Sequence, residues 1–148
     1  MNDSISIRPF LPDDLNAILK IWLSANLQAH DFIDAAYWAD HLEMVRDLLP
    51  QAEIYVYQQR GTPCGFIGIT DGDYIAGIFV DESCRSQGIG KKLLDHVKQK
   101  HPLLKLHVYQ KNGRAVRFYL REGFTCAEEH VDSATGESEL LLTWENKS

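Results

Sequence analysis

Residues 74–91 read Y-I-A-G-I-F-V-D-E-S-C-R-S-Q-G-I-G-K, and this stretch decides the fold. Its first seven residues, Tyr74 to Val80, are an unbroken apolar run, which predicts a strand buried on both faces. A glycine-rich turn follows and leads into a helix that begins near Gly88 and carries an apolar stripe. The stripe consists of Ile89, Leu93, Leu94 and Val97. The stretch therefore predicts a strand, a turn and a helix amino terminus in direct succession.

The turn has the features of an anion site. The first N–H groups of a helix have no partner within the helix, and glycine lets the backbone approach an anion closely. The candidate pyrophosphate ligands are Arg85, Ser86, Gln87, Gly88, Ile89, Gly90 and Lys91. A P-loop would need glycine at Arg85 and serine or threonine at Lys92, and a dinucleotide fingerprint would need glycine at Leu93. A glycine-rich turn that only starts a helix is the alternative for this segment alone.

The flanking segments extend the pattern in both directions. Further strands are predicted at 5–8, 54–58, 66–70, 104–110, 124–131 and 140–144, and further helices at 12–29, 34–49 and 113–121. The helix after the glycine turn connects the strand at 74–80 to the strand at 104–110, and a right-handed crossover of this kind makes them parallel. Such a junction is where an α/β sheet opens to bind ligands. We expect residues 1–148 to form a single domain of the α/β class (mixed α+β).

Composition narrows the function. Hydrophobic residues make up 45% and charged residues 24%, an ordinary globular balance. The formal net charge of −6 repels phosphates, so we expect no nucleic-acid partner. The cysteines (Cys64, Cys84 and Cys126) and the histidines lack metal-ligand spacing, so we expect neither a disulfide framework nor a metal. The first ten residues do not resemble a signal peptide and no segment could span a bilayer, which favours a cytoplasmic protein without membrane contact.

Two blocks of the sequence resemble the GNAT superfamily of N-acetyltransferases. Arg85-x-x-Gly88-x-Gly90 is similar to the family signature Q/R-x-x-G-x-G/A, and residues 112–124 resemble its second block, N-x-x-A-x-x-F-Y-x-x-x-G-F. The resemblance implies the GNAT fold, a central mixed and mostly antiparallel sheet of about seven strands with about four helices. In that fold the fourth and fifth strands are parallel and splay apart. It also implies acetyl-CoA as cosubstrate and no metal.

The resemblance also assigns residues that bind the cosubstrate. The backbone freed where the strands splay is expected to bind the pantetheine arm and the acetyl carbonyl, and it belongs to Ile78, Phe79 and Val80. Asn112 is expected to bond the pantetheine or to fix the turn before the next helix. Ala115 and Phe118 are expected to line the cofactor arm.

Tyr119 is the candidate general acid. The family's tyrosine at this place lies near the thioester sulfur. A phenol with a pKa near 10 is protonated at pH 7 and can donate its proton to a departing thiolate. The alternative is a tyrosine that only packs beside Phe118.

The sequence leaves the general base open. Many family members place a glutamate on the strand before the phosphate loop, but Ala76 and Gly77 stand at the corresponding positions. The candidates are His30, Tyr109, Asp73 or a chain of water molecules. We favour His30, because histidine has a suitable intrinsic pKa and this one lies in the break between the first two helices. A surface or capping histidine is the alternative.

Other histidines and aromatic residues have less specific interpretations. We interpret the remaining histidines as structural or solvated, and they are His41, His96, His101, His107 and His130. Phe32, Tyr37 and Trp38 are candidates for the wall of an acceptor channel, although Trp38 also fits the apolar stripe of its helix.

The function implied by the resemblance is transfer of an acetyl group to a primary amine, by direct attack through a ternary complex. The segments 30–33 and 108–112 are similar to small stand-alone bacterial members of the family, which favours a protein lysine or an N-terminal amine as acceptor. The alternatives are a small-molecule amine (a polyamine, amino sugar or antibiotic) and a CoA-binding module without turnover. Both a monomer and a homodimer are compatible with the sequence.

Overall fold

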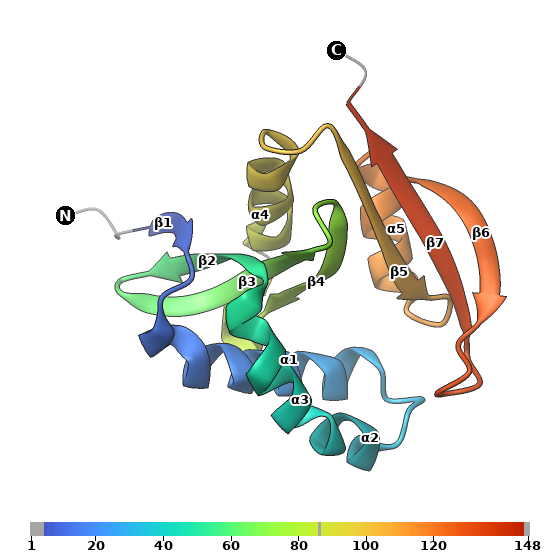
Figure 1. Ribbon diagram of the computed structural model, residues 1–148, viewed down its shortest axis with the longest axis horizontal. Helices are drawn as coiled ribbons and strands as arrows, with labels where there is room; N and C mark the ends of the chain where they lie inside the picture. Colours follow the sequence, from blue (N-terminus) through green and yellow to red (C-terminus); the bar gives the residue numbers. More distant parts are fainter. Residues whose placement is uncertain (1–4, 86, 147–148) are drawn as a thin grey trace.

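The computed structural model describes residues 5–85 and 87–146. Seven strands form one mixed sheet in the order β1-β2-β3-β4-β5-β7-β6 (Figure 1). The strands are β1 (Ile5–Pro9), β2 (Glu53–Gln59), β3 (Thr62–Thr70), β4 (Tyr74–Val80), β5 (Leu103–Tyr109), β6 (Thr125–Val131) and β7 (Ser138–Glu145). The helices are α1 (Leu15–Ala29), α2 (Ala35–Asp40), α3 (Leu42–Leu48), α4 (Ile89–Lys98) and α5 (Gly113–Arg121), with short 3-10 turns at 12–14, 49–51 and 82–84.

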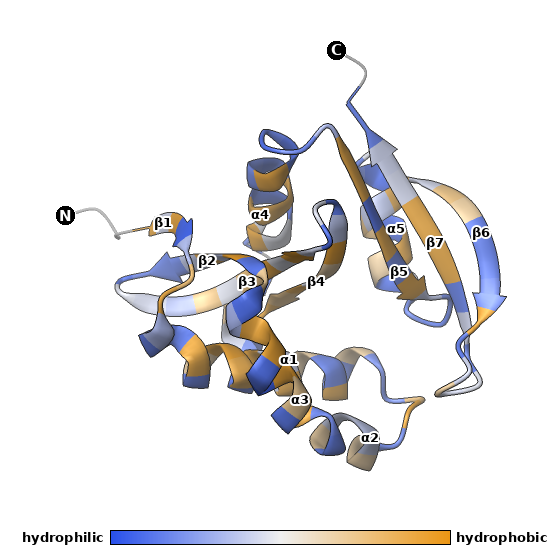
Figure 2. Ribbon diagram, in the orientation of Figure 1, coloured by the Kyte–Doolittle hydropathy of each residue, from blue (hydrophilic) through white to orange (hydrophobic). Residues whose placement is uncertain are grey.

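Helices cover the two faces of the sheet separately, with α1 to α3 on one side and α4 and α5 on the other (Figure 1). Successive residues of a strand point to opposite faces, so Phe66 packs in the cluster under α1 while Ile67 packs under α4. The interior positions of α4, Leu93, Leu94 and Val97, are fully buried. Figure 2 shows that the outer strand β6 is mainly hydrophilic, while β5 and β7 carry hydrophobic residues. No helix among the described residues is long and apolar enough to cross a membrane.

The predicted order of elements is confirmed, including the parallel arrangement of β4 and β5. The helix predicted at 34–49 is instead two helices that meet at His41. The Nδ1 atom of His41 lies 2.6 Å from the carbonyl oxygen of Tyr37, the group that would accept the His41 N–H in a continuous helix. That N–H turns instead to the carbonyl of Trp38, one residue nearer. The side chain thus competes with the helical hydrogen bond and breaks the helix.

The prediction that β4 is buried on both faces is wrong. Only Ile75 of this strand is buried, while Ala76 is exposed and Ile78 to Val80 are partly exposed. The apolar run is real, but its carboxyl half borders two cavities and does not lie in a closed core. The apolar residues in the carboxyl half of β4 therefore line the cavities of the candidate site and do not form the centre of the core.

Candidate active site

The glycine turn after β4 presents the uncapped amino terminus of α4. Gly88 adopts φ +74°, a left-handed conformation that favours glycine, and directs the chain into the helix. Within the described residues, no side chain caps this helix end, so the N–H groups of its first turn remain available to an anion. The predicted succession of strand, turn and helix therefore presents free backbone N–H groups that could bind a pyrophosphate. Ser86, predicted as a further ligand, lies outside the described residues.

A cleft of about 690 Å³ opens beside this turn and runs to α5. Its size is within the range of small-molecule and cofactor sites. Predicted residues that line it are Ile78, Phe79, Val80, Arg85, Gly88, Ile89, Gly90, Lys91, Asn112, Ala115, Phe118 and Tyr119, together with His30. Gln87 is exposed and is not among the lining residues. The cleft thus unites the two sequence blocks, which lie on different helices.

Positive charge comes to the cleft mainly from α5. Arg114, Arg117 and Arg121 recur at i, i+3 and i+7, so they lie on one face of the helix, and all three line the cleft. Arginine is always charged and binds phosphate oxygens well. Lys91, predicted as a phosphate ligand, also lines the cleft, and its Nζ atom lies 3.0 Å from Glu122 and 3.3 Å from Asp95. The arginine row on α5 was missed, although its helical spacing is readable in the sequence.

The strands β4 and β5 separate at the head of the cleft. Among the described residues the parallel ladder consists of a single pair, Tyr74 with Lys105. The other edge of β4 remains paired with β3, where Ile78 lies opposite Ile67 and Val80 opposite Gly65. The β5-facing backbone groups of Ile78 to Val80 are therefore free of strand pairing and are able to bind an extended ligand.

Phe79 shapes this gap from within. A Cβ atom added to Gly77 would lie 2.3 Å from Cζ of Phe79, so the ring of Phe79 folds back over Gly77. The same ring packs on Phe66 at 5.1 Å between centroids and lines the cleft. The position where many family members place a glutamate is thus covered by an aromatic ring, and only glycine leaves room for it.

Tyr119 lies at the junction of the cleft and a second cavity. The second cavity, of about 230 Å³, shares seven lining residues with the cleft: Asn26, His30, Ile78, Phe79, Asn112, Ala115 and Tyr119. The Tyr119 ring packs on Phe124 at 5.4 Å between centroids. Burial raises the pKa of its hydroxyl, so the phenol is protonated at neutral pH and can serve as a proton donor.

His30 is clamped between two asparagines. The Nδ2 group of Asn26 donates to the carbonyl of Trp22 at 2.9 Å, so the Oδ1 atom of Asn26 faces His30 Nδ1 at 3.1 Å and must accept from it. Oδ1 of Asn112 accepts from the Ala115 N–H at 3.3 Å, so Nδ2 of Asn112 donates to His30 Nε2 at 3.1 Å. Both amides are anchored on the backbone, and together they fix the neutral tautomer with its proton on Nδ1.

This clamp changes the interpretation of His30. Burial lowers the pKa of His30 from 6.5 to about 4, and its Nε2 lone pair already accepts from Asn112. The ring also stacks on Trp38 at 5.3 Å between centroids. His30 joins the end of α1 to the cap of α5, so its geometry favours a positioning role over proton abstraction.

The other predicted bases are engaged elsewhere. Tyr109 lines the second cavity, but its hydroxyl donates to Asp132 at 2.7 Å, and burial together with this bond raises its pKa. Asp73 lies 3.8 Å from Lys105 Nζ and is not among the residues that line either cavity. Of the predicted channel wall, Trp38 lines the second cavity, while Phe32 and Tyr37 pack behind it against His30 and Trp38.

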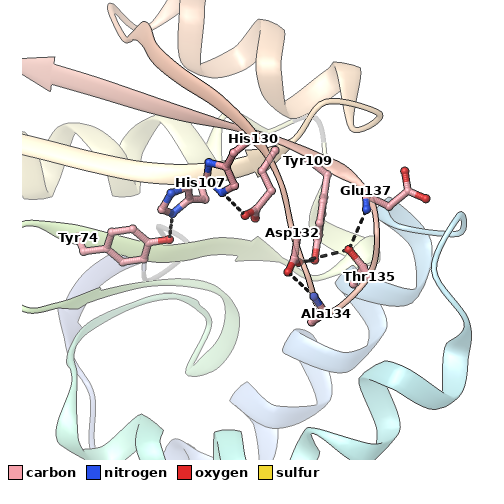
Figure 3. A network of polar contacts seen from close by, with 9 residues as sticks. Tyr74, His107, Tyr109, His130, Asp132, Ala134, Thr135 and Glu137 are labelled. Carbon is pink, nitrogen blue, oxygen red and sulfur yellow. Dashed lines mark hydrogen bonds and ion pairs between the residues drawn. The ribbon is translucent and has the colours of Figure 1, made fainter.

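Two further polar residues line the second cavity and were missed. His107 extends from β5, and Glu139 extends from β7 opposite Tyr109. Figure 3 shows His107 beside Tyr74, whose hydroxyl lies 2.7 Å from His107 Nδ1. The interpretation of His107 as merely structural or solvated is incomplete, because the imidazole borders the cavity. Alternation along 104–110 could have placed it on the same face as Tyr109.

Comparison with known sequences identifies the class. The chain belongs to the GNAT family of acetyltransferases, because residues 26–135 match the family profile described as an acetyltransferase (GNAT) domain. It is 40% identical over 139 residues to the peptidyl-lysine N-acetyltransferase YiaC of Escherichia coli, across 93% of this chain and 92% of that protein. It is 34% identical over 137 residues to the peptidyl-lysine N-acetyltransferase YjaB of Salmonella typhimurium, across 92% and 88%. The chain is therefore an N-acetyltransferase, and the resemblance found in its motifs is confirmed.

Solved structures agree with the fold. The solution structure of apo-form YjaB from Escherichia coli matches with a TM-score of 0.83 and 29% identity, over 97% of this chain and 99% of that one. A PaiA N-acetyltransferase from Thermoplasma acidophilum in complex with coenzyme A matches with a TM-score of 0.81 at 17% identity, over 96% and 99%, which shows the fold alone. The predicted GNAT fold is thus confirmed. Enzymes of this family use acetyl-CoA, and the uncapped helix end and the cationic cleft fit this donor.

Proposed function

We propose that this chain, acting as a single domain, transfers the acetyl group of acetyl-CoA to the side-chain amine of a protein lysine. The observation that carries the proposal is the meeting of two cavities at Tyr119, in the gap between β4 and β5. One cavity is long and cationic and suits a phosphorylated donor. The other is small, and Trp22, Trp38 and Glu139 are among the residues that line it. A narrow channel with aromatic walls and a carboxylate suits one extended alkylamine. The names of the relatives YiaC and YjaB support the same acceptor.

We infer that the amine attacks the thioester directly within a ternary complex. The first turn of α4 and the arginine row of α5 would hold the phosphates of the donor, and the free backbone of Ile78 to Val80 would align the pantetheine arm. N–H groups fixed beside the carbonyl stabilise the negative charge that develops on its oxygen. Tyr119 would give its hydroxyl proton to the departing sulfur. Because the two cavities adjoin at Tyr119, donor and acceptor can be bound together, which removes the entropic cost of a bimolecular encounter.

Three acceptors distinguish the candidate functions. A peptide with a blocked amino terminus and one lysine, a lysine-free peptide with a free amino terminus, and spermidine are each incubated with the protein and acetyl-CoA. Release of free CoA and the mass of the acceptor are followed. Acetylation mainly of the blocked lysine peptide is expected. Exclusive reaction of the lysine-free peptide or of spermidine would refute the proposed acceptor, and no acetylation of any of the three would refute amine transfer itself.

A further inference from the structure

The second cavity holds a histidine and a carboxylate that the transfer step has not yet used. We propose that His107, an exposed residue that also lines the second cavity, takes the proton from the incoming ammonium group and releases it to the solvent. This proposal rests on the proposed function, since it concerns the amine acceptor of the same site. It assigns the base that the sequence left open.

The remaining ionisable groups of the cavity are unsuited to this task. His30 has both nitrogens engaged by asparagines. Tyr109 donates its hydroxyl to Asp132, and Tyr119 is a buried phenol whose pKa is raised. Within the described part of the chain, the ionisable residues left on the cavity lining are His107 and Glu139. Of these, His107 lies on β5, the strand that borders the gap.

His107 contacts aromatic side chains on two sides. On one side Tyr74 reaches His107 Nδ1 from β4 at 2.7 Å. On the other side the ring of His107 meets the ring of His130 edge-on, with centroids 5.2 Å apart. Nε2 of His130 lies 3.0 Å from Oε1 of Glu139. The strand register places these residues on one face, because Glu139 pairs with Tyr109 on one side and with His130 on the other. Figure 3 shows Tyr74, His107 and His130 side by side, with a dashed line between Tyr74 and His107.

Several charged groups lie on the same face as His107. Glu139 is partly buried, and its negative charge helps to raise the pKa of the Tyr74 hydroxyl, after burial itself. Other charged groups near this face are Lys105, which is paired with Asp73, and Glu128, two residues along β6 from His130. Asp132, which accepts from the Tyr109 hydroxyl, also interacts electrostatically with His130. A carboxylate near an imidazole stabilises the imidazolium. His107 is itself exposed, so its proton can pass directly to water.

Two protons leave the amine, and each has a separate receiver. His107 takes one from the ammonium group, which frees the nitrogen lone pair for attack on the acetyl carbonyl. When the new C–N bond has formed and the C–S bond breaks, the sulfur receives the hydroxyl proton of Tyr119. Tyr119 then takes up the second proton of the nitrogen. His107 releases its proton to the solvent, so that the cycle yields the amide, the free thiol and one proton.

The test is the pH dependence of turnover in His107→Gln, which keeps a side chain able to bond Tyr74 but cannot be protonated. The acceptor is the blocked lysine peptide. We expect kcat at pH 7 to fall about 100-fold, with the Kd of acetyl-CoA unchanged. The deficit should shrink as the pH approaches about 10.4, where lysine deprotonates without help. His96→Gln, on α4 with its ring against Tyr55 and outside both cavities, is the control and should keep the wild-type profile.

A second variant, Glu139→Gln, keeps the proposal testable if the first is poorly folded. Removal of the carboxylate should move the acid limb of kcat/KM to lower pH, because the imidazolium loses its anion. A wild-type profile in both variants would overturn the role of His107 while leaving the acetyl transfer intact. An equal loss at every pH would indicate a purely structural role and would also overturn it. Failure of the proposed function is seen separately, as a wild type that acetylates none of the three acceptors.

Discussion

Protonation of His30 should weaken the fold in a defined pH window. Burial lowers the pKa of this residue from 6.5 to about 4, so the folded state binds fewer protons than the unfolded state between these values. The contribution of His30 to the free energy of unfolding is therefore fully present above pH 6.5 and is lost as the pH falls toward 4. Structurally, an imidazolium would point its Nε2–H at the NH₂ group of Asn112, donor against donor.

The size of the loss follows from the pKa. Each pKa unit corresponds to about 1.4 kcal/mol, so the full difference would be worth up to ~3 kcal/mol if the ring were sealed from water. Part of the ring is accessible, and screening by solvent reduces this to ~1 to 2 kcal/mol. His30→Gln can keep both hydrogen bonds but does not titrate. The wild type should therefore lose ~1 to 2 kcal/mol more than His30→Gln between pH 7 and pH 4.5.

The assay is urea unfolding of both proteins at several pH values, with the difference in unfolding free energy as the readout. Carboxylates titrate in both proteins and cancel in this difference. Asn112→Asp gives an independent check, since a carboxylate would accept from the imidazolium and should preserve more stability in acid than the wild type has. A difference between wild type and His30→Gln that stays constant from pH 7 to pH 4.5 would refute the clamp.

Three further changes probe the two cavities. Tyr119→Phe should lower kcat, measured by CoA release, by about tenfold to a thousandfold. Acetyl-CoA binding, measured by calorimetry, should stay nearly intact. Unchanged turnover would exclude the phenol from the mechanism. Arg117→Gln should weaken acetyl-CoA binding about fivefold to tenfold at low salt and make the binding less dependent on salt. The control Arg46→Gln on α3 should change neither. Equal effects of the two variants would argue against phosphate binding by the α5 arginines. Gly77→Ala should push the Phe79 ring into the gap between β4 and β5 and raise the KM of the lysine peptide. A double variant that also carries Phe79→Leu should recover the wild-type KM. An unaltered KM in the single variant would show that the ring has room to move.

Local signals in the sequence predicted the elements that position the donor. The helix at 113–121 was predicted with its observed bounds, because Asn112 caps it and Gly123, at φ +98°, ends it. The glycine turn at Gly88 was equally readable. In both places the residues near in sequence make the decisive hydrogen bonds or supply the required backbone conformation.

The acceptor side depends on contacts between distant residues, which local patterns do not encode. His107 looked like any strand histidine, and its place in the cavity depends on how far β4 and β5 stay paired. His30 was found as a site residue, but its tautomer depends on two asparagines that are far apart in the sequence.

The most direct test of the central claim is calorimetric titration of acetyl-CoA into the wild type, Gly88→Glu and Gly61→Glu. Both glycines have positive φ values, +74° and +77°, and a Cβ atom at either would meet nothing within 4 Å. The two variants therefore carry the same backbone strain and the same added charge, but only Gly88 lies at the amino terminus of α4. Saturable binding in the wild type and in Gly61→Glu, with none in a folded Gly88→Glu, is the predicted result. Equal binding in all three proteins, or none in the wild type, would contradict the account.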